Sequence, residues 1–326
     1  MTFNISVVIP VYLGEHTLRE LIEKIAPLVN GAISPDGRNF RIMEVIMVHD
    51  CGPDRSDKVI HEISQSKSFV KPVWLSRNFG QHAATLAGMA TTKHDWVVTI
   101  DEDCQHNPLE IGKLVDEAVI TNADIVYGVD ANTKIHGLRR SVASRSAKFL
   151  VGVLMGSKSP LNFSSFRLID GSIARGISAY AGDGVYLDVA LGWLTNRVAT
   201  CKVNNELEMR NRSGYSLKKL LGHFLRLILS GGTRPLRIVT VSGISIAITG
   251  ICFAVYVVVG VLVNGEPVAG WTSVIVSILL IGGLVLISLG VIAEYIGLAV
   301  RAAFGKPSYF VRQNRKVIAD QIDSSN

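Results

Sequence analysis

The chain of 326 residues is poor in cysteine, and its four cysteines form no CxxC pair. Disulfide frameworks and structural zinc sites need cysteines at close or regular spacing, so both are disfavoured. Other signatures are also missing. No GxxxxGK(S/T) or GxGxxG segment and no serine nucleophile elbow occur, which argues against a P-loop nucleotide triphosphatase, a dinucleotide dehydrogenase and a serine hydrolase.

Lysine and arginine are absent from residues 238–300. Within this stretch, residues 238–263 and 272–292 are each long enough to cross a hydrocarbon core of roughly 30 Å at about 1.5 Å per residue. We predict two transmembrane helices here, with buried helices of a soluble domain as the alternative. Basic residues flank the two segments on their outer sides, whereas the connector at 264–271 carries none. This asymmetry predicts an integral membrane protein whose amino-terminal part and both termini are cytoplasmic.

The first residues and the net charge of the chain agree with a cytoplasmic domain beside a membrane. Residues 1–9 show no basic region followed by an apolar stretch of signal-peptide length, so export is not predicted. The net charge of +6 could suggest nucleic acid, but no nucleic-acid-binding module is recognisable. An anionic membrane leaflet, which attracts basic segments beside a membrane span, explains the excess better.

The amino-terminal part alternates strand-like and helix-like segments. This pattern predicts an α/β fold with a mostly parallel sheet and helices on both faces. The expected strands are 6–9, 45–48, 72–75, 96–100 and 124–127, and the expected helices are 17–29, 56–66, 81–90 and 108–120.

A second kind of helix is expected just before the first apolar segment. Residues 215–230 place leucine, phenylalanine and isoleucine on one stripe, with lysine and arginine elsewhere on the wheel. This is typical of a helix lying on a membrane surface, and a helix docked on the domain is the alternative. We therefore divide the chain into an α/β domain (1–214), an amphipathic juxtamembrane helix (215–236), a transmembrane hairpin (237–302) and a cytoplasmic tail (303–326).

Carboxylates follow the strand at 96–100 directly, in the sequence VVTIDEDCQHNPLE at 97–110. Ligands of open α/β sheets bind at the carboxyl ends of the strands. Asp101 and Asp103 can both face a hard cation there, so we suspect a divalent metal site. Glu102, between them, is expected to point away and is given no role.

Loops after the other strands carry polar residues that should reach the same edge of the sheet. A carboxylate can bind a ribose or base, an arginine can neutralise a diphosphate, and a metal can bridge the two, so a nucleotide-diphosphate pocket is predicted. For Asp54 the alternative is a helix cap, and for Arg77 a surface ion pair. The residues concerned are Tyr12, Glu15, His49, Asp50, Asp54, Arg77, Asn78 and Gly80.

Several of these segments together resemble a known family. PVYLGEHTL, VHDCGPDRS, LSRNFGQHAATLAGM, DEDCQHNPLE, SSFRLID, MRNRSGYSLKKLL and IAEYIGLAVRAAFGKPSYFVR are similar to segments of the membrane-anchored family 2 glycosyltransferases that make polyprenyl-phosphate sugars, of the dolichol-phosphate mannose synthase and bactoprenol glucosyltransferase type. The resemblance runs from about Ser6 to Arg312. It implies a GT-A fold, a UDP- or GDP-sugar donor, Mg²⁺ or Mn²⁺, and a polyprenyl phosphate acceptor.

The resemblance also implies roles for individual residues. It places Pro10, Tyr12, Glu15 and Asp50 along the nucleoside and Asp101 beside the donor. Asp103 becomes the main metal carboxylate and Gln105 a further metal-site residue. Basic side chains would meet the donor diphosphate or the acceptor phosphate; these are Arg167, Arg210, Arg212 and Lys218.

The chain departs from the family pattern at three places. Relatives usually carry Asn-Glu where Leu13 and Gly14 stand, many carry Asp-Asp where His49 and Asp50 stand, and some carry an aspartate, proposed as a base, where Ser165 stands. A phosphate monoester has its second pKa near about 6, so the acceptor is mostly a dianion at neutral pH and hardly needs a base. Asp183 and Asp188 are candidates for contacting the sugar or assisting catalysis, with helix capping as the alternative.

The sequence therefore predicts a metal-dependent, inverting glycosyltransferase that acts on polyprenyl phosphate at the cytoplasmic membrane face. One alternative is a transferase with another membrane acceptor, such as a diacylglycerol lipid. Another is a non-catalytic membrane scaffold with a decayed pocket. A processive polysaccharide synthase is disfavoured because no QxxRW stretch occurs. Small residues in the apolar segments would allow close helix packing, as in a homo-oligomer.

Overall fold

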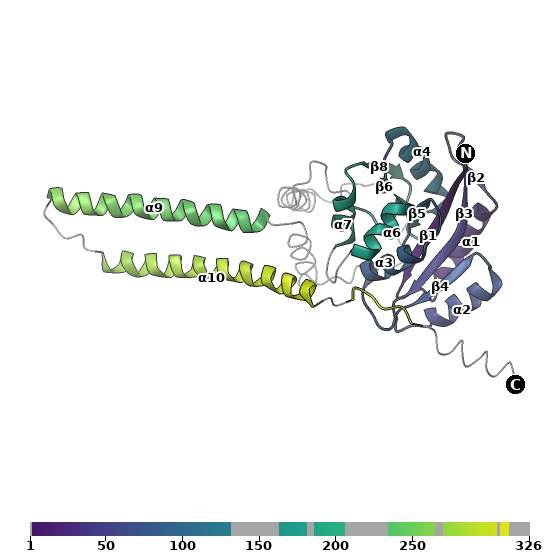
Figure 1. The fold of residues 1–326 in the computed structure, drawn as a ribbon, viewed down its shortest axis with the longest axis horizontal. Helices are drawn as coiled ribbons and strands as arrows, with labels where there is room; N and C mark the ends of the chain where they lie inside the picture. The colour runs from purple at the N-terminus through teal and green to yellow at the C-terminus, as the bar shows by residue number, and fades with distance from the viewer. Residues whose placement is uncertain are drawn as a thin grey trace.

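A computed structural model describes residues 2–131, 163–180, 186–205, 234–264, 270–304 and 307–312. Its amino-terminal part is an α/β domain, from which two long helices extend (Figure 1). The strands are β1 (Thr2–Val11), β2 (Ala32–Ile33), β3 (Asn39–His49), β4 (Val70–Trp74), β5 (Trp96–Thr99), β6 (Ile125–Asp130), β7 (Arg167–Asp170) and β8 (Val198–Val203). The helices of the domain are α1 (Leu18–Val29), α2 (Ser56–Ser66), α3 (Gln81–Thr91), α4 (Ile111–Thr121), which follows a 3₁₀ turn at Pro108–Glu110, α6 (Gly171–Tyr180) and α7 (Leu187–Leu194).

The strands form one mixed sheet in the order β2-β3-β1-β5-β7-β6-β8, with β4 also paired to β3. Strands β4, β3, β1 and β5 run parallel to one another, as alternation of strands and helices predicts. Strand β7 is inserted antiparallel between β5 and β6, and the short β2 is antiparallel to β3. All five strands and four helices expected from the sequence are present in this part of the chain, whereas β2, β7, β8, α6 and α7 were not predicted.

Helices cover both faces of the sheet, because successive strand residues point to opposite sides. In β1, Val7 and Ile9 pack on one face together with α1, α2 and α4. Val8, between them, packs on the other face with α3, α6 and α7. All three side chains are fully buried. The α/β fold with helices on both faces is thus confirmed, and its two cores hold the carboxyl ends of β1, β3 and β5 in place.

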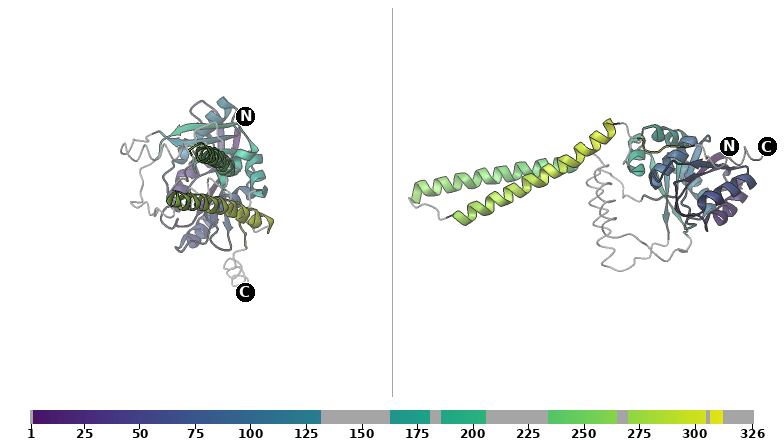
Figure 2. Two further views of the ribbon diagram at one scale, coloured as in Figure 1. Left: turned by 90° about the vertical axis from the view of Figure 1, so that its left-hand side faces the viewer. Right: turned by 90° about the horizontal axis from the view of Figure 1, so that it is seen from below.

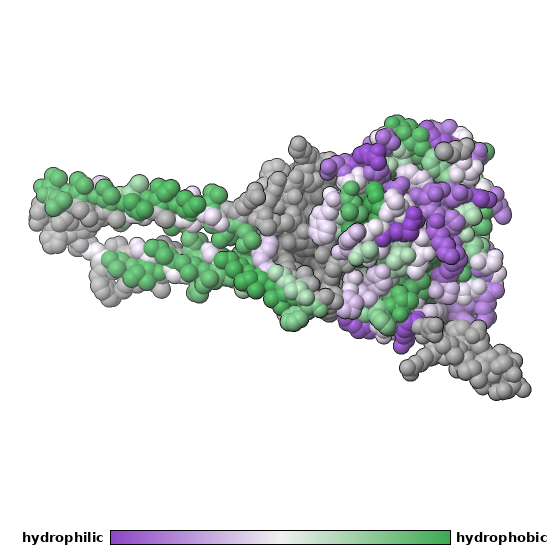
Figure 3. Space-filling view, in the orientation of Figure 1, coloured by the Kyte–Doolittle hydropathy of each residue, from purple (hydrophilic) through white to green (hydrophobic). Residues whose placement is uncertain are grey.

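The two long helices are α9 (Arg234–Asn264) and α10 (Trp271–Ala303). They contact each other and run together away from the α/β domain (Figures 1 and 2). Their surface is largely apolar (Figure 3), with Phe253, Tyr256 and Leu262 each more than 60% exposed. Among the described residues, no helix is both long enough and apolar enough to span a membrane. The two transmembrane helices are therefore not confirmed, and the domain boundaries stay predictions.

After α10 the chain returns to the edge of the sheet. Val311 forms an antiparallel bridge with Leu75, next to the end of β4. The Ser76 amide donates to the Phe310 carbonyl oxygen at 3.0 Å, and the Arg312 amide donates to the Trp74 carbonyl oxygen at 2.9 Å. We call residues 307–312 the tail strand. It ties the end of α10 to the loop that follows β4.

Candidate active site

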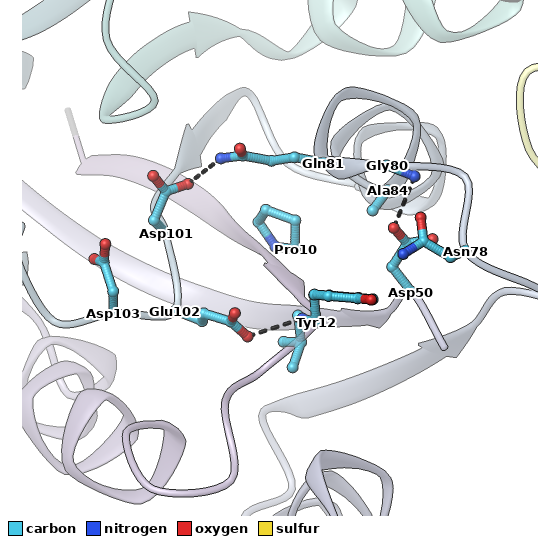
Figure 4. A pocket seen from close by; sticks show the side chains of 11 residues that line it. Pro10, Tyr12, Asp50, Asn78, Gly80, Gln81, Ala84, Asp101, Glu102 and Asp103 are labelled. Carbon is cyan, nitrogen blue, oxygen red and sulfur yellow. Dashed lines mark hydrogen bonds between the residues drawn. The ribbon is translucent and has the colours of Figure 1, made fainter. Parts of the chain in front are cut away.

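A cavity of about 360 Å³ opens at the carboxyl ends of β1, β3 and β5, which is the size range of small-molecule sites. Figure 4 shows its acidic side chains at two ends, with Asp50 on one side and Asp101 and Asp103 on the other. Pro10 and Tyr12 lie between them. The lining residues are Pro10, Val11, Tyr12, Asp50, Asn78, Gly80, Gln81, Ala84, Asp101, Glu102 and Asp103.

Asp50 follows β3 and is only 3% exposed. Its two carboxylate oxygens accept hydrogen bonds from the backbone N–H groups of Phe79 at 2.7 Å and Gly80 at 2.8 Å. Gly80 has a φ of +93°, which suits glycine, and helix α3 begins at the next residue. Burial raises the pKa of Asp50 above its ordinary value, and the two N–H groups oppose that shift. Asp50 thus holds the loop after β4 against the pocket.

Asp101 is fixed by hydrogen bonds to both of its carboxylate oxygens. The Gln81 side-chain amide donates to Oδ1 and the Ser165 hydroxyl donates to Oδ2, each at 2.6 Å. Burial raises the pKa of Asp101, while the Ser165 hydrogen bond lowers it. Ser165, which stands where some relatives carry an aspartate, therefore orients a pocket carboxylate.

Asp103 lies at the same end of the pocket (Figure 4). Its Oδ1 accepts a hydrogen bond from the Gln105 backbone N–H at 3.1 Å, which closes a tight turn. The next residue, Cys104, has a φ of +60°, an uncommon conformation for a side chain other than glycine. Gln105 is not among the residues that line the cavity, so its role at a metal stays a prediction. In the described part of the chain, no group of three or more His, Cys, Asp and Glu side chains could hold a metal ion.

The expectation that Glu102 points away from the pocket is wrong. Glu102 lines the cavity, and its carboxylate oxygens accept hydrogen bonds from the backbone N–H groups of Tyr12 and Leu13, both at 2.9 Å. The segment after β5 is a turn, in which three successive side chains can face one side. Glu102 is drawn toward the pocket because it satisfies two backbone N–H groups of the loop after β1.

Glu15 and Asp54 join the loops after β1 and β3. The Glu15 backbone N–H donates to Asp54 Oδ2 at 3.0 Å, and the Arg55 backbone N–H donates to Glu15 Oε2 at 3.1 Å. Asp54 also accepts from the backbone N–H and hydroxyl of Ser56 at the start of α2. Neither carboxylate lines the cavity, so nucleoside binding by Glu15 stays a prediction, and Asp54 serves the helix start.

Arg77 and Asn78 lie in the loop after β4. Asn78 lines the cavity. The Arg77 guanidinium instead lies 4.2 Å from the centroid of the Phe79 ring, as in a cation–π contact. In this structure Arg77 is not part of the cavity wall, although it lies in the loop that Asp50 holds.

Arg167 and Asp188 form a buried ion pair outside the cavity lining. Arg167 Nε also donates to the Thr99 hydroxyl at 3.0 Å, and the Tyr127 hydroxyl donates to Asp188 at 3.0 Å. Neither charged side chain lines the cavity. Their roles at the donor or acceptor stay predictions, whereas the structure gives them a task in joining β7 to α7.

Some predicted site residues cannot be placed. Arg210, Arg212 and Lys218, the amphipathic helix to which Lys218 belongs, and Asp183 lie outside the described residues. Four residues that line the pocket were given no role from the sequence. Two are apolar, Val11 and Ala84, and two are polar, Gln81 and Glu102. The sequence did offer one signal for Gln81: it begins the helix expected at residues 81–90, directly after a loop predicted to reach the pocket.

Comparison with known proteins agrees with the geometry. Residues 6–177 match the model of the family described as glycosyl transferase family 2. The bactoprenol glucosyl transferase of Shigella phage SfX is 27% identical over 320 residues, covering 96% of this chain and 100% of that protein. The undecaprenyl-phosphate 4-deoxy-4-formamido-L-arabinose transferase of Edwardsiella ictaluri is 28% identical over 311 residues, covering 94% and 93%.

One solved structure gives a more distant likeness. Glucosyl-3-phosphoglycerate synthase from Mycobacterium tuberculosis, in complex with Mn²⁺, UDP and phosphoglyceric acid, aligns with a TM-score of 0.48 at 21% identity. The alignment covers 71% of this chain and 78% of that one. A likeness at this level supports no conclusion about the site.

Proposed function

Because the chain belongs to glycosyl transferase family 2, we propose that it transfers a sugar from a nucleotide-diphosphate sugar to a polyprenyl phosphate. One observation carries the donor part of this proposal: a single cavity has Asp50 at one end, Asp101 and Asp103 at the other, and the Tyr12 ring between them. The first end suits a nucleoside, and the second suits a diphosphate held through a cation. The names of the two relatives support a polyprenyl phosphate as the acceptor, since the alignment with each relative covers nearly the whole chain.

The carboxylates fit a divalent cation that is shared with the substrate. Asp101 is committed to Gln81 and Ser165, which leaves Asp103 as the main protein ligand in the described pocket. Mg²⁺ is characteristically bound by one or two carboxylates together with substrate phosphates and water rather than by a full protein cage. A metal bound with the donor diphosphate would stabilise the negative charge of the leaving group.

The proposed reaction is a single displacement. A phosphate oxygen of the acceptor forms a bond to the anomeric carbon while the bond from that carbon to the donor diphosphate breaks, and the nucleoside diphosphate leaves. One displacement inverts the anomeric centre. The acceptor phosphate is already ionised at neutral pH, so the main tasks of the protein are alignment and charge stabilisation.

We further propose that α9 and α10 associate with the membrane that holds the acceptor, with the α/β domain and both termini in the cytoplasm. The support is chemical. The helices project from the domain, and their described side chains are largely apolar on the face seen in Figure 3. A large exposed apolar surface marks a partner or a lipid environment in stable proteins. A polyprenyl chain is confined to the bilayer, so its phosphate would be presented to a pocket held near the membrane surface.

The proposal is tested by transfer of radiolabel from UDP- and GDP-sugars into lipid that can be extracted with organic solvent. The assay contains the purified full chain, undecaprenyl phosphate and Mg²⁺ or Mn²⁺. Asp103→Asn should abolish transfer, whereas Asp95→Asn, an exposed change at the opposite end of β5, should not. Label that requires both the polyprenyl phosphate and the metal supports the proposal.

Two results would overturn it. Transfer to another lipid, with none to undecaprenyl phosphate, would assign a different acceptor. Absence of transfer from every donor by a folded protein would favour a non-catalytic membrane scaffold. Activity that survives EDTA and Asp103→Asn would overturn the metal part alone.

A further inference from the structure

Glu102 connects the acidic end of the pocket to the loop after β1. It stands between Asp101 and Asp103, yet its carboxylate is directed to the backbone of another segment, 90 residues earlier in the chain. One oxygen accepts from the Tyr12 N–H and the other from the Leu13 N–H, both at 2.9 Å. A carboxylate that accepts two consecutive N–H groups fixes the orientation of the peptide unit between them, and charge-assisted bonds of this kind are stronger than neutral ones.

The space around this contact leaves the loop little freedom to move. A Cβ atom on Gly14 would lie 2.8 Å from Glu102 Oε2, and a Cβ atom on Gly52 would lie 1.6 Å from the Tyr12 carbonyl oxygen. The loop after β1 is therefore enclosed by Glu102 on one side and by the loop after β3 on the other. The absence of side chains at both glycines is what allows this close approach.

Tyr12 presents its ring to the pocket from the loop that Glu102 holds. Tyr12 is 41% exposed, and its ring lies in the pocket between the two acidic ends (Figure 4). The position of a side chain begins with the peptide that carries it, so a shift of the Tyr12 backbone would move the ring within the pocket. The two hydrogen bonds from Glu102 are made to that peptide and to the next one.

We infer that Glu102 is a positioning residue for the donor: it fixes the Tyr12–Leu13 backbone so that the Tyr12 ring meets the nucleoside, and it does not itself bind the cation. Both of its oxygens are occupied by N–H donors, in contrast to a carboxylate placed for a metal. The same residue joins the end of the pocket formed by its neighbours Asp101 and Asp103 to the loop that carries Tyr12. The inference rests on the proposed function, in that the pocket must bind a nucleoside diphosphate.

The test is binding of UDP and GDP to the full chain, measured by calorimetry in Mg²⁺. Glu102→Ala should weaken nucleoside diphosphate binding about 10- to 100-fold, because two charge-assisted hydrogen bonds that order the loop are lost. Glu102→Gln keeps the volume and one acceptor oxygen, so its loss should be smaller. Glu23→Ala, an exposed glutamate on α1, serves as the matched control and should bind as the wild type does.

A double-mutant cycle separates positioning from a general structural effect. If Glu102 acts through Tyr12, then Tyr12→Ala with Glu102→Ala should bind no more weakly than Tyr12→Ala alone. If the fold-losses of nucleoside diphosphate affinity in the two single variants multiply in the double variant, the inference is overturned. A merely structural role would lower the melting temperature without this non-additivity.

A metal measurement completes the design. Mn²⁺ binding, followed by electron paramagnetic resonance, should be unchanged in Glu102→Gln, and a loss of Mn²⁺ with nucleotide affinity intact would overturn the inference. If the wild type binds no nucleoside diphosphate, the proposed function fails, and this inference with it. If the wild type binds and both Glu102 variants bind equally well, only the inference fails.

Discussion

Arg167 on β7 and Asp188 on α7 are paired with each other in the interior, with side chains 4% and 5% exposed. The pair is also bonded to Thr99 on β5 and Tyr127 on β6, so it links three strands and a helix. Burying two charges is costly, and it is offset only while both partners are present. Loss of either partner should therefore strongly lower the stability of the fold, even though neither residue lines the pocket.

Arg167→Met should lower the free energy of unfolding by about 3–5 kcal/mol, because Asp188 is then left buried and uncompensated. Arg167→Met combined with Asp188→Asn should recover much of this loss, since the asparagine oxygen can still accept from Tyr127. Urea titration of the two variants and the wild type measures the effect. If Arg167 instead contacts the donor diphosphate, Arg167→Met would retain its stability and lose nucleotide affinity.

This ion pair also illustrates what the sequence could not reveal. Strands β1, β3 and β5 were predictable because buried parallel strands are runs of apolar residues. Strand β7 begins with an arginine, and its burial is possible only because Asp188 arrives from a helix 21 residues later. Long-range partners of this kind leave no local pattern.

The pocket was predictable to a similar degree. Asp50, Asp101 and Asp103 line one cavity because the carboxyl ends of β3 and β5 share one edge of the sheet, as the strand order implies. The contacts of Glu102 and Gln81 depend on the exact path of the loops. Cys51 and Cys104 adopt left-handed conformations, with φ of +50° and +60°, and nothing in a cysteine indicates such a turn beforehand.

Gly52→Ala should disrupt both the fold and nucleotide binding. The new Cβ atom would lie 1.6 Å from the Tyr12 carbonyl oxygen, so one of the two loops must move. We expect a loss of about 1–3 kcal/mol in stability, typical of overpacking a close contact, with weaker binding of nucleoside diphosphates. Denaturant titration and calorimetry measure the two effects.

Gly192 provides the matched control for this substitution. It lies within α7, and nothing stands within 4 Å of the position of its Cβ atom. Gly192→Ala should be neutral or stabilise the protein by up to about 1 kcal/mol, because alanine favours a helix. Equal losses at the two positions would show that the contact between Gly52 and Tyr12 does not limit the pocket.

Asp116 should make part of the stability dependent on pH. Burial alone raises the pKa of this carboxyl, but hydrogen bonds from the Ser34 hydroxyl and the Asp36 N–H, together with Arg38, outweigh it and hold the pKa below the ordinary value. A depressed carboxyl pKa contributes stability above the unfolded pKa of about 4, and this stability is lost as the pH falls through the folded pKa.

Asp116→Asn is therefore expected to lower the free energy of unfolding at pH 7 by about 1–3 kcal/mol, the range for a buried hydrogen-bond acceptor that loses its partners. The difference from the wild type should shrink as the pH falls below about 4. Denaturant titrations between pH 3 and pH 7 check this, with the exposed Asp95→Asn as control. A difference that stays constant over this range would contradict the assigned role of the Asp116 charge.

The tail strand should stabilise the loop that carries the amides bound to Asp50. Arg312→Pro removes the N–H that donates to the Trp74 carbonyl oxygen at 2.9 Å, and proline cannot replace it. Loss of one such bond should lower the local stability by about 1 kcal/mol. The amide of Ser76, which is bonded to the Phe310 carbonyl oxygen, should then exchange its hydrogen faster.

Arg312→Ala is the matched control, since it removes the side chain and keeps the N–H. Hydrogen exchange followed by mass spectrometry over residues 74–80 compares the two variants. Faster exchange in Arg312→Pro alone, together with weaker nucleoside diphosphate binding, would show that the tail strand supports the Phe79 and Gly80 amides that hold Asp50. Equal exchange in both variants would mean that the loop after β4 keeps its shape without the tail strand, and that the end of α10 and the pocket are independent.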